Sequence, residues 1–224
     1  MSDRSGARFG DWSFERIGGL CRLRGANGLS FGASAAATGS GIVGVDVLGV
    51  PSAPMPGDAR GQFMRLRFRS LGLFEAEPAA HLALGVCGAW RKANPSTPHI
   101  PGAATGRGLI IGNVALAPNG CCEAPVVQLE SFHRDGNALL PDTCSPRLAD
   151  DAWYALEFSA TREAHIAYCL RDESGGKLIA VDLVDNTGDV PPDLGGWWIL
   201  HAFSDHHLEH DWIFEIRDLE VGWL

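Results

Sequence analysis

The last third of the chain alternates apolar and polar residues over short runs, and this pattern restricts the fold more than any other feature. The runs are rich in aromatic and β-branched side chains and too short for core helices. They lie at residues 153–160, 165–170, 177–184, 197–204 and 212–223. Gly-, Pro- and Asp-rich turn sequences, such as ESGG at 173–176, separate them. This part of the chain is therefore predicted to form antiparallel strands.

Similar runs occur further upstream. The segment FMRLRFRS at 63–70 alternates, which places Arg65, Arg67 and Arg69 on one side of a strand and apolar residues on the other. Further strands are predicted at 42–50, 81–90, 108–116 and 125–136. No alternation of strands with helical segments is present, and about nine or ten strands at this spacing are typical of sandwiches. We predict an all-β fold, an antiparallel two-sheet β-sandwich.

The chain is expected to form a single domain over residues 1–224, since this length can bury a substantial core. Residues 9–24 fit either a short amphipathic helix or a strand, and Gly18 and Gly19 weaken the helix. Residues 25–62 are predicted to hold one strand between two loops. Residues 1–40 could form an extended N-terminal arm that packs on the domain.

Net charge and cysteine content indicate which classes of partner the protein can bind and in which compartment it is made. The formal net charge of −9 disfavours nucleic acid and anionic membranes as partners. No apolar segment follows the first Met and no run is long enough to span a bilayer, so we expect no signal peptide and no membrane insertion. Synthesis in the cytoplasm is expected, with a virion or a released particle as another destination. The six cysteines are then predicted to be reduced thiols, and adjacent Cys121 and Cys122 lack the spacing of zinc or redox sites.

From Phe63 onward, the order of the motifs is similar to that of a known superfamily. The strands F-x-R-x-x-F-R, G-L-I-I-G-N, Q-L-E, W-Y-A-L-E-F-S-A and the closing W-x-F-E-I-R-D-L-E-V-G-W follow one another. This order resembles the concanavalin A-like lectin/glucanase jelly rolls, including laminin G-like modules. The resemblance implies a jelly-roll sandwich. Members include lectins, glucanases, polysaccharide lyases and adhesive modules, so the fold does not choose among functions.

Two enzyme classes of that superfamily can be weighed from the residues. Retaining glycosidases need paired carboxylates on one strand, and Glu130 and Glu157 each lack a carboxylate partner on theirs. A lyase needs cations for a uronate carboxylate and a Tyr or His that moves a proton. The chain contains ingredients for such a site on four predicted strands, namely Arg65 and Arg67, Gln128 and Glu130, His165 or Tyr168, and His201.

A binding module needs an exposed aromatic platform and polar groups. Trp197 and Trp198 are adjacent, so one of them faces outward on a strand, and Trp90 begins the long loop that ends at Gly108. The side of the 63–70 strand that carries Arg65, Arg67 and Arg69 suits carboxylate or sulfate groups, or it is a solvated face. The predicted ligand-binding residues are Arg65, Arg67, Trp90, Gln128, Glu130, Tyr168, Trp198 and His201.

The leading interpretation is a non-enzymatic glycan-binding or adhesive module whose partner is a glycan or polysaccharide. One alternative is a phage virion or particle component, such as a tail fibre, head spike or decoration protein, that forms a homo-oligomer or a particle. The other alternative is a polysaccharide lyase.

Metal binding has weak support. His206 and His210 are four residues apart in SDHHLEHDW, but the order differs from H-E-x-x-H, and a polar loop is the favoured interpretation. The residues Asp182, Asp185, Asn186 and Asp189 could hold calcium, although their spacing differs from an EF-hand loop and suits ordinary turns. We expect no cofactor and leave calcium open.

Overall fold

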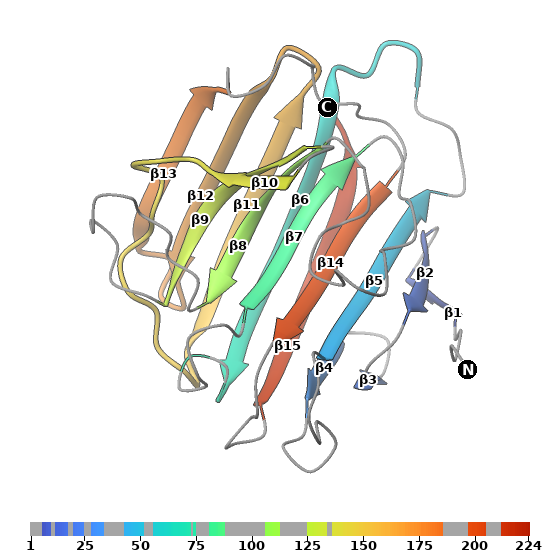
Figure 1. The fold of residues 1–224 in the computed structure, drawn as a ribbon, viewed down its shortest axis with the longest axis vertical. Helices are drawn as coiled ribbons and strands as arrows, with labels where there is room; N and C mark the ends of the chain where they lie inside the picture. Colours follow the sequence, from blue (N-terminus) through green and yellow to red (C-terminus); the bar gives the residue numbers. More distant parts are fainter. Residues whose placement is uncertain are drawn as a thin grey trace.

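The chain folds into two antiparallel β-sheets stacked face to face, as the computed structural model in Figure 1 shows. The backbone is described for residues 6–9, 12–17, 20–24, 28–33, 43–51, 56–72, 74, 81–87, 106–112, 125–133, 136–185, 197–204 and 212–224. Side chains are described for residues 56–72, 74, 84–85, 106–112, 125–131, 139–185 and 214–224. Within these ranges, no helix is long and apolar enough to cross a lipid bilayer.

One sheet has eight strands in the order β1-β2-β5-β14-β7-β8-β9-β10. Their bounds are β1 (Gly6–Phe9), β2 (Trp12–Ile17), β5 (Val43–Pro51), β14 (Trp197–Ser204), β7 (His81–Cys87), β8 (Gly106–Gly112), β9 (Val126–His133) and β10 (Gly136–Leu139). Strands that are far apart in the sequence are neighbours here, because β14 lies between β5 and β7.

The other sheet has seven strands in the order β13-β12-β11-β6-β15-β4-β3. Their bounds are β13 (Lys177–Val184), β12 (His165–Asp172), β11 (Trp153–Thr161), β6 (Gly61–Leu71), β15 (Trp212–Trp223), β4 (Gly28–Ala33) and β3 (Leu20–Arg24). The three strands β11, β12 and β13 follow one another in sequence and pair as a meander. Strand β6 then joins this meander to β15.

The hydrophobic core lies between the sheets and follows from the alternation along each strand. On β6, Met64, Leu66 and Phe68 are buried, whereas the arginines between them face the opposite side. The core also takes Leu109 of β8 and Leu129 of β9 from the eight-stranded sheet. The predicted fold class, an antiparallel two-sheet sandwich, is confirmed.

The structure corrects one sequence-based expectation about elements and decides an alternative that the sequence left open. Residues 28–33, assigned to a Gly-, Ala- and Ser-rich loop, form β4 and pair with β15. Pairing with a long neighbouring strand compensates for low intrinsic strand propensity. The segment considered as an arm contributes β1 and β2 to one sheet, and β3 and β4 to the other. Its residues 12–17 and 20–24 are strands rather than a helix.

One thiol prediction is wrong. Cys144 is disulfide-bonded. Cys169 is a free thiol, as predicted. The expectation of reduced cysteines rested on the N-terminal sequence, which carries no information about which sulfur atoms meet in the fold.

Candidate functional site

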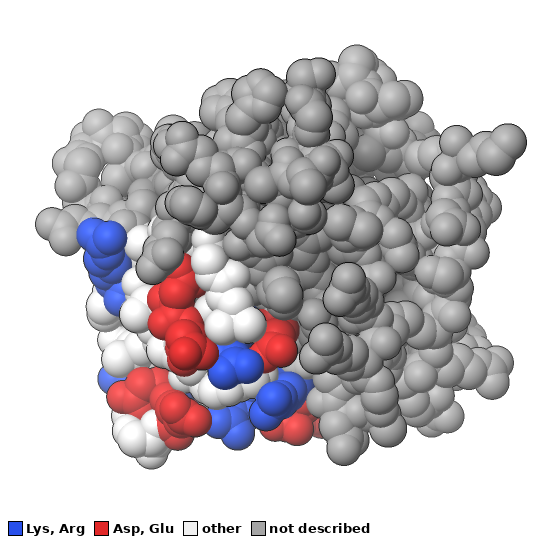
Figure 2. Space-filling model, turned by 90° about the horizontal axis from the view of Figure 1, so that it is seen from below, with Lys and Arg blue, Asp and Glu red and all other residues white. Residues whose placement is uncertain are grey.

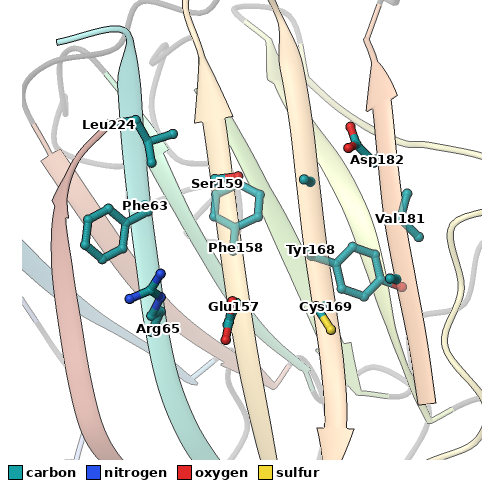
Figure 3. A pocket seen from close by; sticks show the side chains of 12 residues that line it. Phe63, Arg65, Glu157, Phe158, Ser159, Tyr168, Cys169, Val181, Asp182 and Leu224 are labelled. Atoms are coloured by element: carbon teal, nitrogen blue, oxygen red, sulfur yellow. The ribbon is translucent and has the colours of Figure 1, made fainter. Parts of the chain in front are cut away.

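A shallow hollow of about 310 Å³ lies on the outer face of the seven-stranded sheet, across β6, β11, β12 and β13 (Figure 3). Its floor consists of small side chains that are neighbours across the strands. Ser159 pairs with Ala167, and Cys169 pairs with Ala180. Residues on this face alternate with the core residues of the same strands, so the hollow is separated from the core by the sheet alone. We refer to this feature as the outer hollow.

Charged side chains border the outer hollow. Arg65 of β6 and Glu157 of β11 are paired in the strand register, and Asp182 belongs to β13 at the other side, as Figure 3 shows. An Arg65 Nη1 atom lies 3.5 Å from Glu220 Oε2, and His165 Nε2 lies 2.7 Å from Asp182 Oδ1. All four side chains are largely exposed, so each pair contributes about 0–1 kcal/mol. Such weak pairs can be exchanged for contacts with a polar ligand.

On the described part of the face seen in Figure 2, Lys and Arg side chains lie among Asp and Glu side chains. Further along the outer face, Trp153 is only 9% exposed although it points away from the core. Three guanidinium groups cover its ring, those of Arg67, Arg69 and Arg217, with carbon-to-centroid distances of 5.9, 5.0 and 4.4 Å. Cation–π attraction favours this arrangement. Arg69 also binds Glu215 at 2.6 Å.

Of the residues predicted to bind ligand, Arg65 and Arg67 lie on this outer face. Tyr168 belongs to the same sheet, but its side chain is on the core side and 3% exposed. Its hydroxyl donates a hydrogen bond to the Thr143 carbonyl oxygen, and burial raises the pKa of the Tyr168 phenol. Tyr168 therefore ties β12 to residues 140–145, and a role in ligand contact or proton transfer at the surface is not supported.

Gln128 and Glu130 lie on β9 in the eight-stranded sheet, each 1% exposed. The Gln128 Nε2 atom donates to the Leu140 carbonyl oxygen at 3.0 Å. Residues 140–145 run beside β9, with hydrogen bonds from Leu140 N to the Leu129 carbonyl oxygen and from Ser145 N to the Val127 carbonyl oxygen. The structure does not bring Gln128 and Glu130 together with Arg65 and Arg67.

For the remaining residues that were predicted to bind ligand, the structure does not describe the side chains. Trp198 and His201 lie on β14, where Trp198 is in register with Val86 and shares the face of Leu84, a core residue. His201 is at a position of the opposite face. Trp90, and the weak metal candidates His206 and His210, lie outside the described residues.

The sequence analysis missed a buried ion pair. The Arg107 Nε atom of β8 lies 2.5 Å from Asp185 Oδ2, just after β13, so the pair joins the two sheets. Both side chains are inaccessible to solvent. Burial lowers the pKa of the Arg107 guanidinium, and the Asp185 charge opposes this change. The local sequence G-R-G gives no apolar pattern that would have revealed burial.

The donor atoms in the described residues do not fit the proposed calcium loop. Asp185 contacts Arg107 in the interior, whereas Asp182 is exposed and contacts His165. Asn186 and Asp189 lie outside the described residues. Over the described ranges, no group of three or more His, Cys, Asp or Glu side chains is placed to hold a metal ion.

Comparisons with known proteins identify the fold. The sequence matches no protein-family model and no curated protein. Among solved structures, it is similar to a seed lectin of Lotus tetragonolobus, with TM-score 0.57, 6% identity and 99% of both chains covered. It is also similar to a Bauhinia forficata lectin in complex with GalNAc (TM-score 0.53, 10% identity, covering 96% of this chain and 98% of that one). The VIP36 exoplasmic/lumenal domain in its Ca2+/Man3GlcNAc-bound form is similar as well (TM-score 0.52, 13% identity, covering 96% and 84%).

These similarities extend over nearly the whole chain, at identities that define the fold alone. The chain therefore has a concanavalin A-like lectin fold, and the resemblance inferred from its sequence is confirmed.

Proposed function

We propose that this protein is a non-enzymatic glycan-binding module and that the outer hollow is its ligand site. The observation that carries the proposal is a hollow with a small-residue floor and a charged border on a lectin-type sandwich. The solved lectin of Bauhinia forficata holds GalNAc, and the VIP36 domain holds Man3GlcNAc. A glycan is accordingly the ligand class that the similarity favours.

The chemistry of the outer hollow suits a sugar. Small side chains on the floor allow the ring of a sugar to approach the sheet closely. The Glu157 and Asp182 carboxylates can accept hydrogen bonds from hydroxyl groups, and Arg65 can donate them. Phe63 adds an apolar wall beside Arg65, whose guanidinium carbon is 5.0 Å from the Phe63 ring centroid. Convergent polar groups beside an apolar wall are typical of small-ligand sites.

A lyase is not favoured by the same residues. Tyr168 is held in the core, and Gln128 and Glu130 belong to the other sheet. Among the described residues they do not converge with Arg65 and Arg67 on one surface. No observation favours a virion or particle component either, so binding is the function we propose to test.

A glycan array with the purified protein tests the proposal. Glu157→Ala and Asp182→Ala each remove one carboxylate from the border, and each is expected to weaken binding of the glycan that is found by about tenfold, as loss of a charged hydrogen bond predicts. The matched control is Glu173→Ala, which removes an exposed carboxylate from the 173–176 turn. Binding that is unchanged in both hollow variants would remove the site from the outer hollow, and no binding on the array would overturn the function.

A further inference from the structure

A row of cations crosses five strands of the seven-stranded sheet beside the outer hollow. In the strand register, Arg217 of β15 is opposite Arg67 of β6, and Arg67 is opposite Ala155 of β11. Ala155 is opposite Arg171 of β12, and Arg171 is opposite Lys177 of β13. All of these positions face away from the core. We call Lys177, Arg171, Arg67 and Arg217 the cation row.

The charges of the cation row are not compensated by carboxylates in the part of the chain that the structure describes. Among the described residues, no Asp or Glu oxygen lies within 4.0 Å of the charged nitrogen atoms of these four side chains. The neighbouring arginines differ, because Arg65 contacts Glu220, and Arg69 contacts Glu215 and Asp151. Like charges placed directly opposite each other on a sheet are destabilising. The contact with the Trp153 ring offsets this repulsion for Arg67 and Arg217, whereas among the described residues Arg171 and Lys177 have neither an aromatic ring nor a carboxylate to offset theirs.

The geometry of the row suits an extended ligand. Neighbouring strands lie about 4.8 Å apart, so five strands extend over about 19 Å, which is long enough for several sugar units. Ala155, in the middle of the row, has a small side chain, so a ligand can approach the sheet closely there. The Trp153 ring lies against the Arg67 and Arg217 guanidinium groups, at 5.9 and 4.4 Å, and this contact limits their freedom. A guanidinium held in place can bind a carboxylate or a sulfate through two parallel hydrogen bonds.

We propose that the cation row binds the negatively charged substituents, carboxylate or sulfate, of an acidic polysaccharide that lies across the strands. This inference rests on the proposed glycan-binding function and names its ligand class. The net negative charge of the protein does not oppose it strongly, because charges further than about 8 Å away are screened at physiological ionic strength. Duplex DNA also carries anionic groups, but the similarity to solved lectins favours a polysaccharide, so DNA is the competing ligand in the test.

Isothermal titration calorimetry of the full-length protein tests the inference. The probes are polygalacturonate for carboxylates, dextran sulfate for sulfates, dextran as the neutral polymer, and duplex DNA. We expect at least one acidic polysaccharide to bind at least tenfold more tightly than dextran and DNA. Arg67→Gln/Arg217→Gln is expected to raise the Kd for that polysaccharide at least tenfold, and Arg171→Gln to raise it by a smaller factor.

The matched control is Arg60→Gln/Arg147→Gln, which changes the net charge equally at two exposed arginines outside the row. It should change the Kd less than twofold, with melting temperatures showing that each variant is folded. Equal losses in both double variants, or equal affinity for DNA, would overturn the inference. If glycans bind in the array but the acidic polymers bind no better than dextran, the inference falls and the proposed function stands. If no glycan of either kind binds, both fall.

Discussion

The two faces of the seven-stranded sheet are built by the same strands, yet they obey different requirements. On β11, Leu156 and Phe158 face inward and are almost fully buried, whereas Glu157 and Ser159 between them face outward at the outer hollow. The inner face is apolar and belongs to one continuous cluster with the opposite sheet. The outer face carries like charges in register. The inner face thus has the pattern that folding requires, whereas the outer face contains the like-charged pair Arg171 and Lys177, which does not stabilise the fold.

Arginine residues show the same contrast between the interior and the surface. Arg107 is enclosed with one carboxylate, Asp185, and its charge is compensated where water cannot reach it. Arg67 and Arg217 are opposite each other in water without a carboxylate partner among the described residues. A buried charge must be paired because desolvation is costly, whereas an exposed charge can stay available to a ligand.

The largest expected effect comes from breaking the buried pair. Arg107→Leu removes the guanidinium group that faces the buried Asp185 carboxylate, so the free energy of unfolding should fall by about 3–5 kcal/mol in urea denaturation. The double variant Arg107→Leu/Asp185→Leu should recover most of this loss, because neither charge of the pair remains in the interior. A loss below about 1 kcal/mol in the single variant would mean that water reaches the pair.

Removing one hydroxyl group from each face of the sheet compares how much each face contributes to the free energy of unfolding. Tyr168→Phe leaves the buried Thr143 carbonyl oxygen without this donor and should lower the free energy of unfolding by about 1–2 kcal/mol. Ser159→Ala, on the outer face of the neighbouring strand, should change it by less than about 0.5 kcal/mol. Equal effects in the same denaturation experiment would contradict the assignment of the two faces.

The smallest expected effect tests whether individual surface charges raise or lower the free energy of unfolding. Arg171→Gln removes the repulsion with Lys177 and should raise the free energy of unfolding by up to about 0.5 kcal/mol at low salt. Arg65→Gln removes the contact with Glu220 and should lower it by about 0–1 kcal/mol. Both differences should vanish near 1 M salt, where screening acts within about 3 Å. Shifts of the same sign would show that the cation row is not under repulsion.

Much of the fold could be predicted because strand alternation is a local property. The bounds of β13 and β14 agree with residues 177–184 and 197–204, and the inward side of β6 was identified through Met64, Leu66 and Phe68. Strand β4 was missed because its Gly- and Ser-containing sequence GLSFGA has weak strand propensity. Its pairing with β15 is a contact between distant parts of the chain, which a local pattern does not contain.

The site was predicted only in part for the same reason. A period of two tells which residues share a side of one strand, but it does not tell which strands are neighbours or what covers each side. Arg65 was therefore grouped with Gln128 and Tyr168, which the structure places in the other sheet and in the core.

The sequence by itself determined that this protein is a sandwich of antiparallel strands, and which side of β6 would be apolar. The tertiary structure alone decided that Arg217, Arg67, Arg171 and Lys177 form one row and that Arg107 meets Asp185 inside the sandwich. The physical reason is the distance along the sequence over which each property is determined. Alternation is set by neighbouring residues, whereas strand order depends on how the whole chain buries its apolar faces.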